Sequence, residues 1–233
     1  HFFNPPRYLR LLEIIPTPHT DPEVVDFLMH YGDLTLGKTT VLCKDTPAFI
    51  ANRVGVFGMM AIMNAMEKLQ LNVDEIDALT GPVIGRPKSA TFRTGDVVGI
   101  DTLVKVAKGV HDNCPDDEAK DQFSIPTWLH KMVENNWLGD KTGQGFFKKV
   151  RSASGEKEIL TLNLQTMEYG PRQKPKFATL ETAKPIDDLK LRLKALCAGT
   201  DKAGEFYRQF HYNLFSYISH RIPEITDELY RVD

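Results

Sequence analysis

Short apolar runs near the start of the chain predict two β-strands. Residues 8–15 are rich in branched apolar side chains and are bounded by prolines, and residues 39–43 form a second short run. Runs of this kind are typical of short, largely buried strands. Between them, Thr20 and Glu23 frame a helix start that has a proline in its first turn, and Gly32 marks the helix end.

The most apolar segment of the chain, residues 47–69, predicts a long helix that is buried on nearly all sides. In a chain of 233 residues, such a helix is either a central core helix or part of a subunit interface. Asn52 and Arg53 stand out as polar residues in its first turns. An asparagine at this place is either a core residue with satisfied hydrogen bonds or part of a functional site.

More helices and a β-hairpin are expected further along the chain. Apolar periodicity and capping signals predict helices over residues 73–79, 90–98, 101–113, 126–136, 187–197 and 202–220, and a last one from Pro223. Residues 146–150 and 158–164 predict the two strands of a hairpin with a turn at Ser154-Gly155. Residues 170–185 are rich in proline, lysine and threonine, which favours a linker.

Residues 32–39 match the GxxxxGK[ST] letters of a phosphate-binding loop. That motif requires a strand before the loop and a helix after it, because the helix N-terminus must face the phosphates. Here a helix leads in and a strand leads out. Leu34 and Leu36 are also poor residues for a loop whose amides must wrap an anion. The match is therefore interpreted as accidental.

Composition restricts the classes of function. The chain is 42% hydrophobic and 26% charged, as is ordinary for a soluble globular protein, and its net charge of -2 gives no electrostatic reason to expect a nucleic-acid partner. Three distant cysteines lack metal-ligand spacing, so neither a metal site nor disulfides are expected. No apolar run reaches membrane-spanning length. We therefore expect a reducing compartment, which is the cytoplasm or else an organelle lumen that keeps thiols reduced.

An acid-base pair is suggested by His1 and Glu13. Glu13 falls within the first predicted strand, and a buried carboxylate needs a polar partner. His1 is the nearest candidate, since a turn at residues 4–6 can fold the chain back towards the strand. A histidine held by a carboxylate is the usual arrangement of a general base near neutral pH. The alternative is a solvated terminal histidine and a carboxylate at a sheet edge.

Four stretches, taken together and in order, resemble the 3-hydroxyacyl-CoA dehydrogenase family. They are His1-Phe2-Phe3-Asn4-Pro5 with Glu13, the segment from Lys44 to Arg53, the segment from Gly95 to Asp101, and Lys141-Thr142-Gly143-Gln144-Gly145-Phe146-Phe147. The resemblance covers about residues 1–150.

The resemblance implies a role for each matching residue. His1 is expected to take the proton from the substrate 3-hydroxyl, and Glu13 to orient the imidazole and stabilise its charged form. Asn52 is expected to hydrogen-bond the reacting oxygen. Asn4 and Lys141 are expected on the side of the NAD cofactor. The reaction implied is the oxidation of a 3-hydroxyacyl-CoA to the 3-ketoacyl-CoA in fatty-acid β-oxidation.

The implied fold is mainly α and has four parts. Residues 1–45 are expected to be the end of an NAD-binding Rossmann domain, followed at 46–150 by a helical substrate and dimerisation domain like the carboxy-terminal domain of 6-phosphogluconate dehydrogenase. A hairpin and linker are expected at 151–185, and a truncated second helical unit at 186–233. Aligning its end with residues 73–78 places Arg208 at the position of Asn52, so this unit is not expected to repeat the polar site.

No GxGxxG that follows a strand occurs in the sequence, so the chain is expected to be a fragment that does not bind NAD or turn over by itself. The parent protein resembles long multifunctional bacterial fatty-acid oxidation proteins, some of which carry a fused enoyl-CoA hydratase. Homo-oligomerisation through residues 47–69 is expected. The competing hypotheses are a non-catalytic helical assembly module and a related hydroxyacid or imine dehydrogenase.

Overall fold

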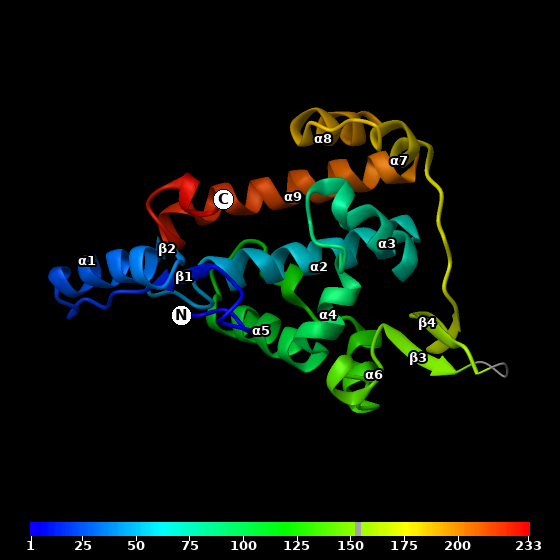
Figure 1. Cartoon of the computed structure of the whole chain (residues 1–233), viewed down its shortest axis with the longest axis horizontal. Helices are drawn as coiled ribbons and strands as arrows, with labels where there is room; N and C mark the ends of the chain where they lie inside the picture. Colours follow the sequence, from blue (N-terminus) through cyan, green and yellow to red (C-terminus); the bar gives the residue numbers. More distant parts are fainter. Residues whose placement is uncertain (152–154) are drawn as a thin grey trace. The chain divides into compact units, whose positions relative to one another are not determined.

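The structure is a computed structural model that describes residues 1–151 and 155–233 (Figure 1). Helices make up most of its regular structure, as predicted. The chain divides into two compact units. The terminal unit contains residues 1–55 and 215–233, and the central unit contains residues 56–214. Two long helices, α2 (Ala51–Leu69) and α9 (Lys202–Ile225), each contribute residues to both units.

The terminal unit begins with a parallel strand pair, β1 (Leu11–Ile14) and β2 (Thr39–Leu42). Parallel strands need a crossover, and it is supplied by α1 (Pro22–His30) and a π-helical turn at Tyr31–Thr35. Asp21, rather than the predicted Thr20, caps α1, because its side chain accepts the Glu23 amide. The stretch that resembles a phosphate loop thus follows a helix and enters a strand.

The prediction that Gly32 ends α1 is wrong. Gly32 lies inside the π-helical turn that follows the helix. The turn packs closely on the strand pair: a Cβ at Gly32 would lie 2.5 Å from Cγ2 of Thr40 and 3.0 Å from Cδ2 of Leu12. A glycine is therefore required by close approach, and the chain continues through the turn towards β2.

Helix α2 begins at Ala51, four residues later than predicted, and ends at Leu69 as predicted. Residues 47–50 form a turn instead. Ala48 and Phe49 have φ angles of 66° and 52°, in the left-handed region that helical residues do not occupy. The first turn of the predicted helix is therefore replaced by a left-handed connection.

The core of the terminal unit joins residues from both ends of the chain. Cys43, Ile50 and Ile225 are buried together, and partly buried apolar side chains pack on them: Ile15, Val41, Phe49, Val54 and Val232. The Lys44 amide also donates to the Ile225 carbonyl at 3.0 Å. The last turns of α9 are therefore an integral part of this unit.

The central unit is built from short helices around the buried part of α2. They are α3 (Val73–Thr80), α4 (Phe92–Val98), α5 (Ile100–Asn113), α6 (Thr127–Glu134), α7 (Ala178–Ala183) and α8 (Leu189–Ala198), with 3-10 turns at Pro82–Ile84, Lys120–Phe123 and Asp140–Thr142. Met60, Ala61, Ile62 and Met63 of α2 are all 0% exposed. The helix predicted over residues 73–79 is confirmed, and the capping signal before it is a capping box formed by Asn72 and Glu75.

The predicted hairpin is present as β3 and β4, and a third strand that was not predicted extends it to a three-stranded antiparallel sheet. It contains β3 (Phe147–Arg151), β4 (Lys157–Asn163) and β5 (Glu168–Pro171) in that order. The predicted turn includes Ser154, which lies outside the described residues. The predicted linker at 170–185 is wrong in part, since it contains the end of β5 and helix α7.

Helix α9 is continuous where two helices had been predicted. Pro223 lies inside it, two residues before its end. A proline there removes one main-chain hydrogen bond of the last turn, and the helix tolerates that loss close to its terminus. After it, residues Leu229–Arg231 form a 3-10 turn. Within the described part of the chain, no helix has the length and apolar character needed to cross a membrane.

Candidate active site

His1 and Glu13 form a hydrogen-bonded pair across two neighbouring chain segments. His1 Nδ1 lies 2.7 Å from Glu13 Oε2, and the Glu13 side chain is 1% exposed against 30% for His1. Their backbones are also paired, because the His1 nitrogen donates to the Glu13 carbonyl at 2.7 Å and the Glu13 amide donates to the His1 carbonyl at 3.1 Å. Phe2 and Leu12 continue this antiparallel pairing. Directly opposite residues of such a pair project on the same face.

The second oxygen of Glu13 is held by the start of α2. Glu13 Oε1 accepts the amides of Ile50 at 3.1 Å and Ala51 at 2.8 Å. A buried carboxylate is costly unless its oxygens are satisfied, and here the imidazole and two main-chain donors satisfy them.

This arrangement fixes the tautomer of His1. A carboxylate only accepts hydrogen bonds, so Nδ1 of His1 carries a proton, and Nε2 of the neutral ring keeps its lone pair. The His1 ring packs near Phe3 and Phe49, at centroid distances of 4.6 and 5.4 Å. The pair can therefore act as a general base through Nε2, with Glu13 stabilising the imidazolium.

Asn52 follows directly after the two amides that bind Glu13. It is half-buried in the first turn of α2. His1, Glu13 and Asn52 therefore belong to one unit and are linked through the N-terminus of a single helix. Asn4 belongs to the same unit and is exposed in the bend that precedes β1. Lys141 belongs to the central unit, where its ammonium binds Asp101 and lowers the pKa of that carboxyl.

Cys43 is a neighbour of Glu13 that the sequence alone did not single out. It follows β2, is 2% exposed, and its amide donates to the Ile14 carbonyl at 2.9 Å. Burial, together with the nearby Glu13 charge, raises the pKa of the Cys43 thiol to about 12. The thiol stays protonated beside the carboxylate and is not a nucleophile. Cys43 directly precedes the second family-like stretch, which begins at Lys44, and this position could have marked it as a neighbour of the site.

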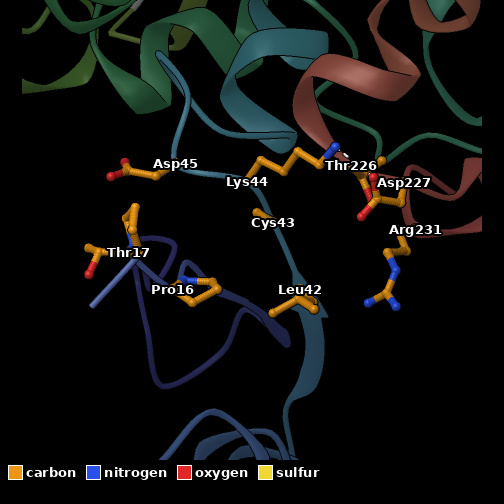
Figure 2. A pocket seen from close by; sticks show the side chains of 10 residues that line it. Pro16, Thr17, Leu42, Cys43, Lys44, Asp45, Thr226, Asp227 and Arg231 are labelled. Atoms are coloured by element: carbon orange, nitrogen blue, oxygen red, sulfur yellow. Dashed lines mark ion pairs between the residues drawn. The ribbon is translucent and has the colours of Figure 1, made fainter. Parts of the chain in front are cut away.

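A cavity of about 390 Å³ opens at the carboxyl ends of β1 and β2 (Figure 2). Its lining residues are Pro16, Thr17, Pro18, Leu42, Cys43, Lys44, Asp45, Thr226, Asp227 and Arg231. Lys44 reaches across to Asp227 at 2.6 Å and to the Pro223 carbonyl at 2.8 Å. Because the Lys44 ammonium is already paired with these groups, we interpret Lys44 as a structural contact between the end of β2 and the end of α9.

A second cavity, of about 640 Å³, lies in the central unit between the end of α2, the start of α3 and the β4–β5 edge. Trp128 in its wall donates through Nε1 to Glu67 at 2.8 Å. None of the five residues predicted for the site lines either cavity. In the described part of the chain, no group of three or more His, Cys, Asp or Glu side chains is arranged to hold a metal ion.

Two family models match the chain. The model for the NAD binding domain of 3-hydroxyacyl-CoA dehydrogenase matches residues 1–46, and the model for the C-terminal domain of the same enzyme matches residues 49–149. Together they cover well over half of the chain. Both models describe domains of one class of protein, the 3-hydroxyacyl-CoA dehydrogenases.

Known proteins of similar sequence and structure agree with these family matches. A probable 3-hydroxyacyl-CoA dehydrogenase of Bacillus subtilis is 45% identical over 100% of this chain and 29% of its own length. A putative fatty acid oxidation complex trifunctional enzyme of Rickettsia prowazekii is 29% identical over 100% of this chain and 31% of its own length. The crystal structure of FadB2 from M. tuberculosis has a TM-score of 0.57 and 29% identity, over 64% of this chain and 51% of that chain.

The chain belongs to the 3-hydroxyacyl-CoA dehydrogenase family. The resemblance inferred from the four sequence stretches is thus confirmed. The chain spans less than a third of the length of the Bacillus and Rickettsia relatives.

Proposed function

We propose that this chain supplies the acid-base dyad and the helical part of an NAD-dependent 3-hydroxyacyl-CoA dehydrogenase. The observation that carries the proposal is the geometry around Glu13, which binds His1 Nδ1 through one oxygen and the first amides of α2 through the other. This geometry leaves Nε2 of His1 as a base. Family membership supplies the reaction in which such a base is needed.

In the proposed reaction, Nε2 of His1 takes the proton of the substrate 3-hydroxyl. A bound NAD would supply the acceptor for the hydride of C3, and the product would then be a 3-ketoacyl-CoA. Glu13 stabilises the imidazolium as it develops, and its two main-chain donors keep it in place. Asn52 hydrogen-bonds the reacting oxygen and holds C3 in a productive position. We assign Asn4 and Lys141 to the cofactor side of the complete enzyme.

We infer that residues 1–233 by themselves do not sustain turnover. They contain no glycine-rich dinucleotide fingerprint after a strand, and the NAD-binding model matches only residues 1–46. Residues 1–45 are proposed as the end of the NAD-binding domain, 46–150 as the helical substrate domain and 186–233 as part of a second helical unit.

Two partners are proposed for the whole protein besides the acyl-CoA. A fused enoyl-CoA hydratase is supported by the trifunctional relative of Rickettsia. Self-association through α2 stays a prediction. The middle of α2 is buried by other parts of this chain, as expected if α2 is a central core helix and not part of a subunit interface. A cytoplasmic location is likewise proposed from the absence of disulfide or metal spacing among the three cysteines.

The test replaces His1 by glutamine in the full-length protein. NADH formation from a 3-hydroxyacyl-CoA is expected to fall by roughly 10²–10⁴-fold, since general-base catalysis contributes about that factor. The exposed His19 provides a control, and H19Q is expected to keep full activity. If H1Q turned over at the rate of H19Q, the catalytic assignment would be lost, and a helical module whose function is assembly alone would be favoured.

A further inference from the structure

Arg53 is a charged side chain with no exposed surface at the start of α2. It is 0% exposed, although arginine is rarely buried without partners. Its Nε donates to the Tyr217 hydroxyl at 2.6 Å, and its guanidinium pairs with Glu224 Oε1 at 3.0 Å. Both partners lie near the end of α9, 164 or more residues away in the sequence.

These contacts belong to a larger cluster at the end of α9. The second oxygen of Glu224 accepts from Arg221 at 2.9 Å. The Arg221 guanidinium also lies over the Tyr217 ring, 5.4 Å from its centroid. Two cations, one carboxylate and one phenol thus hold each other in place. Charge-assisted contacts of this kind are directional and fix geometry more strongly than apolar packing does.

Arg53 also reaches the turn that precedes α2. Its guanidinium lies 3.5 Å from the Pro47 carbonyl, at the first residue of the left-handed turn. Non-glycine residues in left-handed conformations persist only where their surroundings fix them. The last residue of this turn, Ile50, and the first residue of α2, Ala51, present their amides to Glu13. Arg53 therefore connects the turn at residues 47–50 to α9 through its contacts with Pro47, Tyr217 and Glu224.

We propose that Tyr217 and Glu224 are positioning residues for the His1–Glu13 dyad. They hold Arg53, Arg53 fixes the turn at 47–50, and the turn places two amides on Glu13 and Asn52 beside them. The carboxy-terminal part of the chain thereby sets the geometry of a site whose reacting residues all lie near the amino terminus. This inference rests on the proposed function, because it assigns the cluster a role in the same reaction.

A role in positioning has a consequence that a role in stability alone does not have. If the turn loosens, Glu13 loses main-chain donors that share its negative charge. The carboxylate then stabilises the imidazolium of His1 more strongly. His1 then keeps its proton up to a higher pH, so the acid limb of the kcat/KM profile shifts to higher pH.

The test compares two phenylalanine substitutions on the same helix. Tyr217→Phe removes the hydroxyl that accepts from Arg53 Nε. Tyr207→Phe is the matched control, since Tyr207 is likewise buried, at 0% exposed against 2% for Tyr217, and its hydroxyl donates to the Leu79 carbonyl at 2.7 Å, within the central unit. In the full-length protein, Y217F is expected to lower kcat by about 10-fold with KM within about 2-fold, because misplaced catalytic groups affect the chemical step. Its acid limb shifts to higher pH, and Y207F leaves the limb unchanged.

Amide hydrogen exchange at Ile50 and Ala51 gives a readout that does not need turnover. Faster exchange of these amides is expected in Y217F than in Y207F, and Glu224→Gln is expected to behave as Y217F does. Equal kinetics, pH profiles and exchange in Y217F and Y207F would overturn the positioning role. An inactive wild-type protein would instead remove the proposed function, while the exchange comparison still decides whether α9 fixes the turn. Should Y217F not fold, the E224Q comparison decides in its place.

Discussion

Glu13 accepts hydrogen bonds from three separate residues, and each of its oxygens has a different task. One oxygen orients His1, and the other joins the strand to the first amides of α2. A carboxylate is needed for this because it accepts on all sides. An amide of the same size has one end that can only donate.

Glu13→Gln is therefore expected to be almost as damaging as the loss of His1. If the amide nitrogen faces His1, the ring must move its proton to Nε2 and loses its base. If it faces α2, it opposes two donors. We expect kcat in the full-length protein to fall by roughly 10²–10⁴-fold, measured as NADH formation at saturating substrate. E23Q, at the exposed start of α1, serves as the control, and a kcat for E13Q equal to that of E23Q would refute the role.

Cys43 gives a second prediction for a single residue. With its pKa raised to about 12, only on the order of 10⁻⁴ of this thiol is ionised at pH 8, and the thiolate is the reactive form. Iodoacetamide is expected to leave Cys43 unmodified in the native protein and to modify it fully after denaturation. Peptide mass spectrometry reads both states. Rapid alkylation in the native state would show that the thiol is neither buried nor beside a charged Glu13.

The start of α4 depends on a buried carboxylate. Asp77 accepts the amides of Thr91, Phe92 and Arg93 at 3.1, 2.7 and 3.2 Å. Burial nevertheless raises the pKa of Asp77 from 3.8 to about 6. The folded state therefore binds this proton more tightly than the unfolded state does.

The sign of the pH effect follows from linkage. A raised carboxyl pKa contributes stability below pH 3.8, and this contribution is lost as the pH rises through about 6. The free energy of unfolding of the wild type, relative to that of Asp77→Asn, is expected to fall between these two pH values. Urea titrations at several pH values measure it. An increase over the same interval would mean that the three amide donors outweigh burial and that the pKa is lowered.

Local signals in the sequence were enough for elements that are stabilised locally. The Asn72–Glu75 capping box marks the start of α3 correctly, and branched apolar runs mark β1 and β2. The start of α2 was placed wrongly, because the left-handed turn is held by Glu13, which is distant in the sequence, and by Arg53, which is itself held by the distant Tyr217 and Glu224. Strand β5 was missed since it pairs only through β4 and carries few apolar residues.

In the candidate site too, residues marked by local sequence motifs could be predicted, and residues brought in by long-range contacts could not. Spacing alone left His1 and Glu13 as one option among several, and the family motifs turned that option into a definite prediction. Tyr217 and Glu224 could not be found in this way, because no pattern within the sequence links them to residue 53. Only the folded chain brings them together.

A binding measurement tests the proposal for the isolated chain. Residues 1–233 expressed alone are expected to show no saturable NAD binding by calorimetry, while the full-length protein binds it, because the glycine-rich fingerprint of a dinucleotide site is not among these residues. Far-UV circular dichroism establishes that the isolated chain is folded. Binding with a Kd near that of the full-length protein would show that the chain holds a complete cofactor site.

The backbone pairing of His1 with Glu13 restricts how this region can vary in length. Because side chains alternate between the two faces of a strand, one residue inserted or deleted between Phe2 and Leu12 can be absorbed only by the exposed loop at residues 4–9. A slip of the pairing by one position would turn the imidazole to the opposite face of the strand, with every catalytic residue still present in the sequence. Relatives of this protein are therefore expected to differ in loop length here, while the register of residues 1–2 against β1 stays constant.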